Sequence, residues 1–334
     1  MQFFPVLFSL LAITTTSVLA QSANIGAPAD MTEVSAGSNF TVMIDRPDTL
    51  TGSTEVALVI ALLSCASNPC PGPSEELGTV LYDGPFDPQF TTEPGTGSLP
   101  PHENFTLTIP STFTKGQAQL GVAHFFLLGA SVAPILETFN STITHASYKE
   151  KWNAPRADKI AWIILLKKMG WIVLVPFVAL LLLPPSSTMR LLSALFSLLA
   201  ITTTSVIAQS ANIGAPADMT QVSAGSDFTV MIERPDSLTS STEVALVISL
   251  LNCPSSCPGP SVSLGTILYN GPFDPQFSAP EPGTDNLPPH ENFTLTVPST
   301  FTKGNAQLGV VHVYLLGLAL TPELETFNTT IIVT

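Results

Sequence analysis

Four cysteines, arranged as two close pairs, are the residues whose spacing most directly suggests chemistry. Cys65 and Cys70 stand five positions apart, and Cys253 and Cys257 stand four apart. In an exported domain an even number of cysteines predicts disulfides, here one small closed loop per pair. A redox dithiol and a metal site are the alternatives, but a zinc site needs four ligands and no other cysteine is available. A local disulfide in each pair is the favoured interpretation.

The remaining polar residues match no catalytic motif. The sequence lacks G-x-S-x-G, H-E-x-x-H, a phosphate-binding loop and G-x-G-x-x-G. The two His-Glu pairs that begin at His102 and His290 fall in predicted loops, away from any helix that could form a zinc site. His124 and His312 lie within apolar runs, where a hydrogen-bonded core histidine is favoured over a general base. We therefore expect no enzymatic activity, no cofactor and no metal.

A tandem repeat organises the chain that must position these residues. The opening sequence from Met1 recurs from Met189, 188 residues later, and the match continues to the C-terminus. It is broken by one deletion in the cysteine loop and one insertion before EPGT. Roughly three positions in four agree, far more than between the units of a solenoid. Each unit has the size of one domain, so the repeat is a duplication of a whole coding unit.

The repeat divides the chain into five segments. Residues 1–20 are a predicted secretory signal peptide, because an apolar run ends in Val18-Leu19-Ala20 before Gln21. Residues 21–144 (copy 1) and 209–334 (copy 2) are the two domains. Residues 189–208 are an internal segment that resembles a signal peptide and begins with its own methionine, and residues 145–188 join it to copy 1. This order suggests that two adjacent genes, each encoding a secreted protein, have been read as one chain.

The join, residues 145–188, differs from both copies in composition. It contains six basic and two acidic residues and all three tryptophans. Its apolar stretch, 160–183, is a candidate membrane segment that would pair with residues 191–208 as a hairpin. The basic residues before it would lie on the exported side, against the positive-inside tendency. A translated non-coding stretch is the favoured interpretation, and any membrane contact is expected only through 160–183.

Composition excludes several classes of protein. Copy 1 carries twelve acidic and two basic residues, and copy 2 carries eleven and two. With a net charge of −14, the chain lacks the basic patch of a nucleic-acid-binding protein. Thirty prolines and twenty-one glycines argue against a helical bundle, because both residues destabilise helix interiors.

Short β-rich runs separated by Pro/Gly/Ser/Asn clusters predict an all-β fold. FTVMID (Phe40–Asp45) and FTLTI (Phe105–Ile109) alternate as half-buried strands, whereas Glu55–Ser64 and Ala118–Leu128 are almost wholly apolar and suit central strands. A helix is the rival for Glu55–Ser64, but its β-branched residues favour a strand. With Gly78–Tyr82 and Glu137–Thr144 the pattern predicts six or seven strands. We expect an antiparallel, immunoglobulin-like β-sandwich, present twice in tandem.

Two further sets of surface residues stand out. Sequons for N-glycosylation, whose use would point those faces to solvent, begin at Asn39, Asn104, Asn140, Asn292 and Asn328. The Pro-rich segment LYDGPFDPQF carries aromatic residues that could form a partner-binding loop, or could instead anchor the loop to the core. The candidate loop residues are Tyr82, Pro85, Phe86 and Phe90 in copy 1 and Tyr269, Pro272, Phe273 and Phe277 in copy 2.

Long motifs in both copies carry a family resemblance. GTxLYxGPFxPQ and PPxxNFTxxxPS occur in both copies and are followed in copy 1 by KGQAQLGVAHFFLLGA. The resemblance that they carry extends over nearly the whole of each copy. The chain resembles the necrosis-inducing secreted protein family of fungal effectors. Members are small single-domain proteins of plant-associated fungi, and the family supplies no catalytic residues. The tandem arrangement departs from this pattern, as does Leu308–Leu320, where copy 2 is bulkier.

The resemblance implies a function. Such effectors suppress pattern-triggered immunity by targeting host plant receptor-like kinases at the plasma membrane, and some induce cell death. We therefore expect a virulence glycoprotein secreted to the apoplast that inhibits its partner by binding. A secreted cell-wall or carbohydrate-binding β-sandwich is the alternative, although sugar-stacking surfaces use exposed Trp or Tyr and the mature copies contain no Trp. A secreted hydrolase is the enzymatic alternative.

Overall fold

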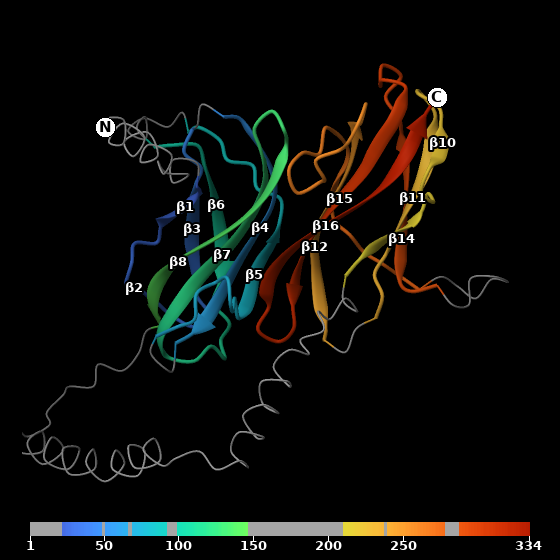
Figure 1. The fold of residues 1–334 in the computed structure, drawn as a ribbon. Coiled ribbons are helices and arrows are strands. Elements are labelled where there is room, and N and C mark those ends of the chain that lie inside the picture. The colour runs from blue at the N-terminus through green and yellow to red at the C-terminus, as the bar shows by residue number, and fades with distance from the viewer. Residues whose placement is uncertain are drawn as a thin grey trace, which may run out of the picture. The chain divides into compact units, whose positions relative to one another are not determined.

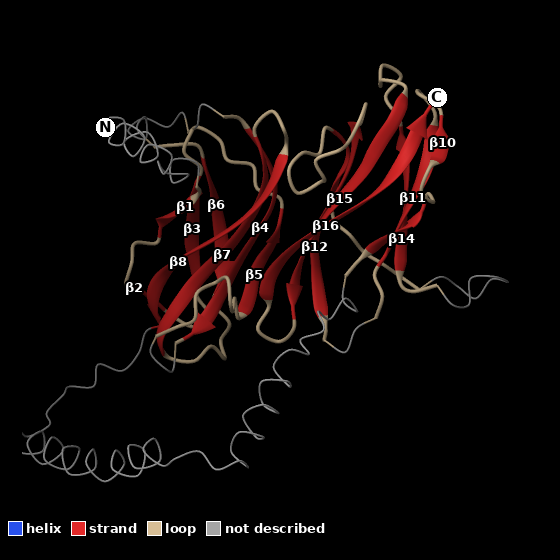
Figure 2. Cartoon of the chain, in the orientation of Figure 1, coloured by secondary structure: helices blue, strands red, loops and turns tan. Residues whose placement is uncertain are grey.

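The computed structural model describes residues 22–48, 51–65, 69–91, 99–145, 210–236, 239–277 and 287–334. These residues form strands, turns and loops but no helix (Figures 1 and 2). The described part of the chain thus has no helix long and apolar enough to cross a membrane. The predicted signal peptide, the join after residue 145, its candidate membrane segment 160–183 and the internal segment 189–208 lie outside the described residues.

Each copy contributes eight strands to the described structure. In copy 1 they are β1 (Asn24–Ala27), β2 (Thr32–Val34), β3 (Asn39–Asp45), β4 (Ser53–Ser64), β5 (Thr79–Gly84), β6 (His102–Thr108), β7 (Gly116–Leu128) and β8 (Ala133–His145). In copy 2 they are β9 (Asn212–Ala215), β10 (Thr220–Val222), β11 (Asp227–Glu233), β12 (Ser241–Asn252), β13 (Thr266–Gly271), β14 (His290–Thr296), β15 (Gly304–Leu316) and β16 (Thr321–Val333).

The strands of each copy form two sheets. In copy 1 the three-stranded sheet has the order β1-β3-β6 and the five-stranded sheet has the order β2-β8-β7-β4-β5; copy 2 repeats both orders. The predicted all-β fold in two tandem copies is confirmed, and its arrangement is compatible with the immunoglobulin-like architecture. One feature differs from the antiparallel expectation. β2 pairs with β8, and β10 with β16, in parallel.

The core of copy 1 lies between its two sheets. Alternate side chains of β3 and β6 face inward, among them Val42 and Phe105, as the period of two in FTVMID and FTLTI predicts. They pack against Leu58 and Ile60 of β4 and Leu120 of β7. β4 and β7 are interior strands of the larger sheet, which confirms the prediction from their continuous apolar runs and excludes a helix at Glu55–Ser64. Copy 2 has the equivalent core.

Two short strands were not predicted, and one loop prediction was wrong. β1 and β2 were missed because NIGA and TEV are short and carry little apolar signal. His102-Glu103 and His290-Glu291 are not in a loop but begin β6 and β14. The reason is pairing with a distant strand: His102 lies opposite Asp45 at the end of β3, and local sequence does not show such a partner.

Gly78 allows the cysteine loop of copy 1 to return to the sheet. Its φ is +82°, in the left-handed region, and a Cβ there would lie 2.5 Å from the main-chain oxygen of Leu62. Gly265 repeats this at φ +75°, with the Leu250 oxygen 2.8 Å away. Both positions therefore need glycine for conformation and for space.

We predict that Gly78→Ala combined with Gly265→Ala destabilises the protein more than Gly37→Ala combined with Gly225→Ala. All four glycines have positive φ, so each pair incurs the backbone strain of about 1 kcal/mol or more per site. Only the first pair adds a clash with main-chain atoms, which should cost a further ~1–3 kcal/mol per copy. Urea unfolding of the parent chain and the two double variants checks this, and equal losses of stability in the two variants would contradict the close approach.

Candidate functional site

A fully buried histidine held between two carboxylates is the main polar feature of each copy. In copy 1, His124 is 0% exposed and its Nε2 donates to Glu55 Oε2 at 2.5 Å, while its Nδ1 donates to Glu137 Oε1 at 2.9 Å. The three residues come from neighbouring strands β7, β4 and β8, and Glu137 lies directly opposite His124 in the ladder. The predicted hydrogen-bonded core histidine is confirmed.

Two further residues extend this network to other parts of copy 1. Arg46, which follows β3, donates from Nε to Glu55 Oε1 at 3.0 Å, and its guanidinium lies 4.5 Å from the ring centroid of Phe126. The network therefore links the three-stranded sheet to the five-stranded sheet. The main-chain N–H of Ala23 donates to Glu137 Oε1 at 2.9 Å, which ties the start of the domain to β8.

Copy 2 repeats the network almost unchanged. His312 bonds Glu243 and Glu325, Arg234 Nε lies 3.2 Å from Glu243, and the Ala211 N–H lies 2.8 Å from Glu325. The cation–π partner is Tyr314 in place of Phe126, with 4.7 Å between the guanidinium and the ring centroid. An arrangement kept in both copies is a shared property of the domain and not an accident of one of them.

The pairing changes the pKa values of its members in opposite directions. Burial alone would raise the pKa of Glu55, but hydrogen bonds from His124, Ser53 and Arg46 outweigh it and lower this pKa to about 2. Burial alone would lower the pKa of His124, but hydrogen bonds to Glu137 and Glu55 raise it. The pairing thus favours the imidazolium form of His124 between two ionised carboxylates.

We predict a stability plateau at mildly acid pH. The glutamate contribution is complete above the ordinary pKa of 4.5 and is lost as pH falls towards about 2. The histidine contribution is complete below the ordinary pKa of 6.5 and is lost as pH rises through the raised folded pKa. The contribution of this network to the thermal midpoint should therefore be greatest between about pH 4.5 and 6.5. In the double variant His124→Gln/His312→Gln, the decrease in thermal midpoint that the histidines cause above pH 6.5 should disappear. If the thermal midpoints of the parent and the variant decrease in parallel above pH 6.5, the histidines are not the groups responsible.

We also predict that Glu137→Gln together with Glu325→Gln lowers the free energy of unfolding by about 1.5–3 kcal/mol per copy, the range for a lost hydrogen bond to a charged group. The matched control is Glu33→Gln, because Glu33 is exposed and copy 2 already carries Gln221 at that position. The control should change stability by less than about 0.5 kcal/mol. Urea unfolding gives the free energy of unfolding of each variant. If the double variant loses no more stability than the control, the network contributes little.

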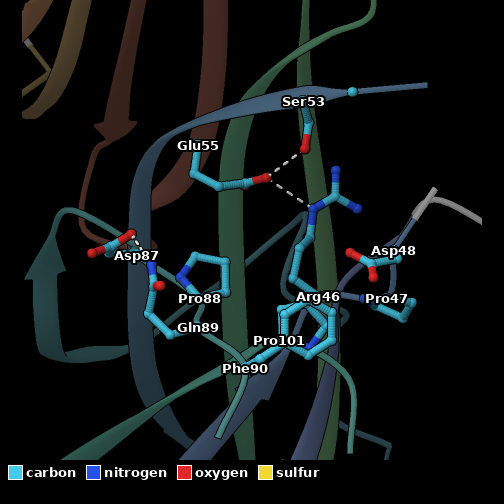
Figure 3. Close-up of a pocket in the computed structure, with 11 residues that line it drawn as sticks. Arg46, Pro47, Asp48, Ser53, Glu55, Asp87, Pro88, Gln89, Phe90 and Pro101 are labelled. Carbon is cyan, nitrogen blue, oxygen red and sulfur yellow. Dashed lines mark hydrogen bonds and ion pairs between the residues drawn. The ribbon is translucent and has the colours of Figure 1, made fainter. Parts of the chain in front are cut away.

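A surface hollow of about 370 Å³ lies at the outer side of the network in copy 1 (Figure 3). Arg46 and Glu55 form part of its wall, and the loop after β5 forms the other part. Phe90 in this loop is 62% exposed. The hollow is lined by Arg46, Pro47, Asp48, Gly52, Ser53, Glu55, Asp87, Pro88, Gln89, Phe90 and Pro101. Ten of these eleven residues have identical counterparts in copy 2, where Ser240 stands for Gly52.

The candidate partner-binding loop divides into anchors and an exposed tip. The Tyr82 hydroxyl donates to the Pro85 oxygen at 2.5 Å, and the Tyr82 ring lies 4.6 Å from Phe105. Phe86 is 4% exposed and packs edge-on against His124. Tyr82 and Phe86 therefore anchor the loop to the core, whereas Phe90 faces solvent. In copy 2, Tyr269 bonds Pro272, Phe273 is 4% exposed and Phe277 is 66% exposed.

The structure also places the other predicted site residues. Cys65 bonds Cys70 and Cys253 bonds Cys257, as the spacing suggested. All five sequon asparagines are exposed. Asn39 and Asn104 lie on β3 and β6, and Asn292 lies on β14; Asn140 and Asn328 lie on β8 and β16. Among the described residues no group of three or more potential metal ligands comes together.

Sequence reasoning missed the acidic and basic partners of the histidine. The sequence predicts Glu55 only as part of a strand, and no motif singles out Arg46. A usable signal existed, because a histidine inside an apolar strand must find two hydrogen-bond partners, and in copy 1 each neighbouring strand carries one glutamate. What the sequence lacked was the strand register that selects Glu55 and Glu137.

Comparison with known proteins gives one clear relationship. A model of the Nis1 family matches residues 18–144 and 206–332, which cover most of both copies. The chain belongs to the Nis1 family. Nis1 membership indicates an effector-like protein, and it establishes the two copies as two units of one family. A search of curated proteins found no match.

Solved structures show only weak similarity to this Nis1-family chain. Fibronectin(III)-like modules of CbhA from Clostridium thermocellum are 8% identical, with 94% of each chain covered and a TM-score of 0.23. A cellulose-active polysaccharide monooxygenase from M. thermophila is 11% identical over 36% of this chain and 55% of its own, with a TM-score of 0.24. The titin domains z1z2 are 10% identical, with 94% of this chain and 96% of the titin chain covered, and the TM-score is 0.19. These similarities are too weak to indicate a shared fold or function.

Proposed function

We propose that the chain is a secreted fungal effector that binds and inhibits receptor-like kinases of the host plant. It would thereby suppress pattern-triggered immunity, acting by binding and not by catalysis, with cell death as a further outcome. The observation that carries the proposal is the Nis1 family match over both copies. The motifs GTxLYxGPFxPQ and PPxxNFTxxxPS support the same conclusion through their resemblance to secreted necrosis-inducing effectors.

The hollow beside Arg46 is the surface that we propose for partner contact. A large aromatic side chain held in solvent by an anchored loop is typical of interface residues that dominate binding energy. Phe90 and Phe277 fit this description, since each follows a buried phenylalanine on a proline-rich loop. The loop is fixed before binding, so little conformational entropy would be lost when a partner covers the ring.

The test is an in vitro kinase assay with the purified secreted chain and kinase domains of plant receptor-like kinases. We expect dose-dependent loss of substrate phosphorylation and direct binding in a pull-down. Absence of both binding and inhibition across a panel of such kinases would remove the proposed target class.

We predict that Phe90→Ala combined with Phe277→Ala weakens kinase binding by about thirtyfold or more, which corresponds to the loss of a hot-spot side chain of about 2 kcal/mol. The matched control is Met31→Ala combined with Met219→Ala, because these side chains are 51% and 49% exposed and lie outside the loop. The control should bind like the parent chain. Calorimetry gives both affinities, and equal effects of the two pairs would exclude the loop as the contact surface.

A further inference from the structure

A second hollow, of about 360 Å³, lies beside the disulfide loop of copy 2. This volume falls within the range of about 300–1,000 Å³ for small-molecule sites. Its walls are neutral and rich in amide and hydroxyl groups, and none of the described residues that form them is charged. They are Cys253, Ser255, Ser256, Cys257, Pro258, Gly259, Asn305, Gln307, Asn328 and Thr330.

Two neighbouring strands supply the amide groups of this hollow. Gln307 on β15 lies directly opposite Thr330 on β16, and Asn305 and Asn328 are each two residues away from them. Because side chains alternate along a strand, all four point to the same face of the sheet. Asn328 Nδ2 donates to Gln307 Oε1 at 2.8 Å. Asn328 also opens the sequon Asn328-Thr329-Thr330 and is exposed.

One buried amide group of this wall lacks a partner. Gln307 is only 3% exposed, and its Nε2 finds no hydrogen-bond acceptor among the described residues. In copy 1 the equivalent Gln119 Nε2 donates to the Glu76 oxygen of the longer cysteine loop, at 3.4 Å. A buried N–H without an acceptor is unfavourable, so copy 2 has a donor available where copy 1 does not.

We propose that this hollow is a sugar-binding site and that its occupant is the first sugar of a glycan on Asn328, an N-acetylglucosamine. The proposal requires export through a glycosylating pathway and is independent of which host protein the chain binds. A sugar matches the chemistry of the walls, because it is uncharged and offers several hydroxyl groups and one amide oxygen. The covalent bond would form between C1 of the sugar and Asn328 Nδ2, which already lies within the wall. One N–H bond of the amide and the bond from C1 to the diphosphate of a lipid-linked sugar donor would break, and the lipid diphosphate and a proton would leave.

The position of the sugar has a structural consequence. A ring attached to Asn328 and seated among Ser255, Ser256 and Asn305 would lie over the Cys253–Cys257 loop. Gly309 leaves room for the segment that follows this loop, since a Cβ there would lie 3.1 Å from the Pro260 side chain. The glycan would therefore stabilise the closed loop and shield its disulfide from reductants.

The test measures how fast dithiothreitol reduces Cys253–Cys257 in the full chain secreted from a glycosylating eukaryotic host, followed by mass spectrometry. We expect Asn328→Gln to accelerate reduction about fivefold, because the loop opens more often without the sugar. The matched control is Asn292→Gln, which removes a glycan from β14 in the other sheet and should leave the rate unchanged. Equal rates for the two variants, or an unglycosylated Asn328 in the secreted chain, would overturn the proposal.

Two further comparisons separate the sugar from the asparagine itself. Trimming the glycan to its first sugar should preserve the slow reduction, and in chain made in bacteria Asn328→Gln should have no effect. In copy 1, Asn140→Gln should change the reduction of Cys65–Cys70 less, because Gln119 already bonds Glu76. Loss of protection on trimming, or the same acceleration in bacterial protein, would show that the first sugar does not occupy the hollow.

Discussion

The imidazole of His124 between the carboxylates of Glu55 and Glu137 is the interaction on which the rest of each domain depends. Charged groups inside a protein are unfavourable unless every one is paired and hydrogen-bonded, so three strands must present these side chains at one level. A slip of one residue in β4, β7 or β8 would turn one member to the opposite face of the sheet. The network therefore acts as a registration point for the five-stranded sheet.

The surface of the domain follows from this registration point. Arg46 brings the end of β3 to Glu55 and so fixes the distance between the two sheets beside the hollow. Phe86 packs on His124 and fixes the loop after β5, which leaves Phe90 in solvent. A buried ion network thus sets the geometry of an exposed aromatic side chain. The network and the hollow residues that it positions both recur in copy 2.

The sequence predicted the architecture well because its signals were local. FTVMID and FTLTI alternate, and the apolar runs at Glu55–Ser64 and Ala118–Leu128 became interior strands. The cysteine pairs were also close enough in sequence to predict their bonding. The parts that it did not predict depend on long-range pairing. β2 is three residues long and exists because it lies beside the end of β8, and the glutamates of the network are selected by register. No local sequence pattern predicts the pairing of β2 with β8 or the strand register that brings the glutamates to the histidine.

The hydrogen bond from the Ala23 N–H to Glu137 bears on how this chain came to hold two domains. Its counterpart at Ala211 forms in the middle of the chain, so the contact recognises a peptide N–H and needs no free amino terminus. The same main-chain contact thus closes the start of both domains, although different lengths of chain precede Ala23 and Ala211. As far as this hydrogen bond is concerned, the domain can begin after a cleaved end or within a continuous polypeptide.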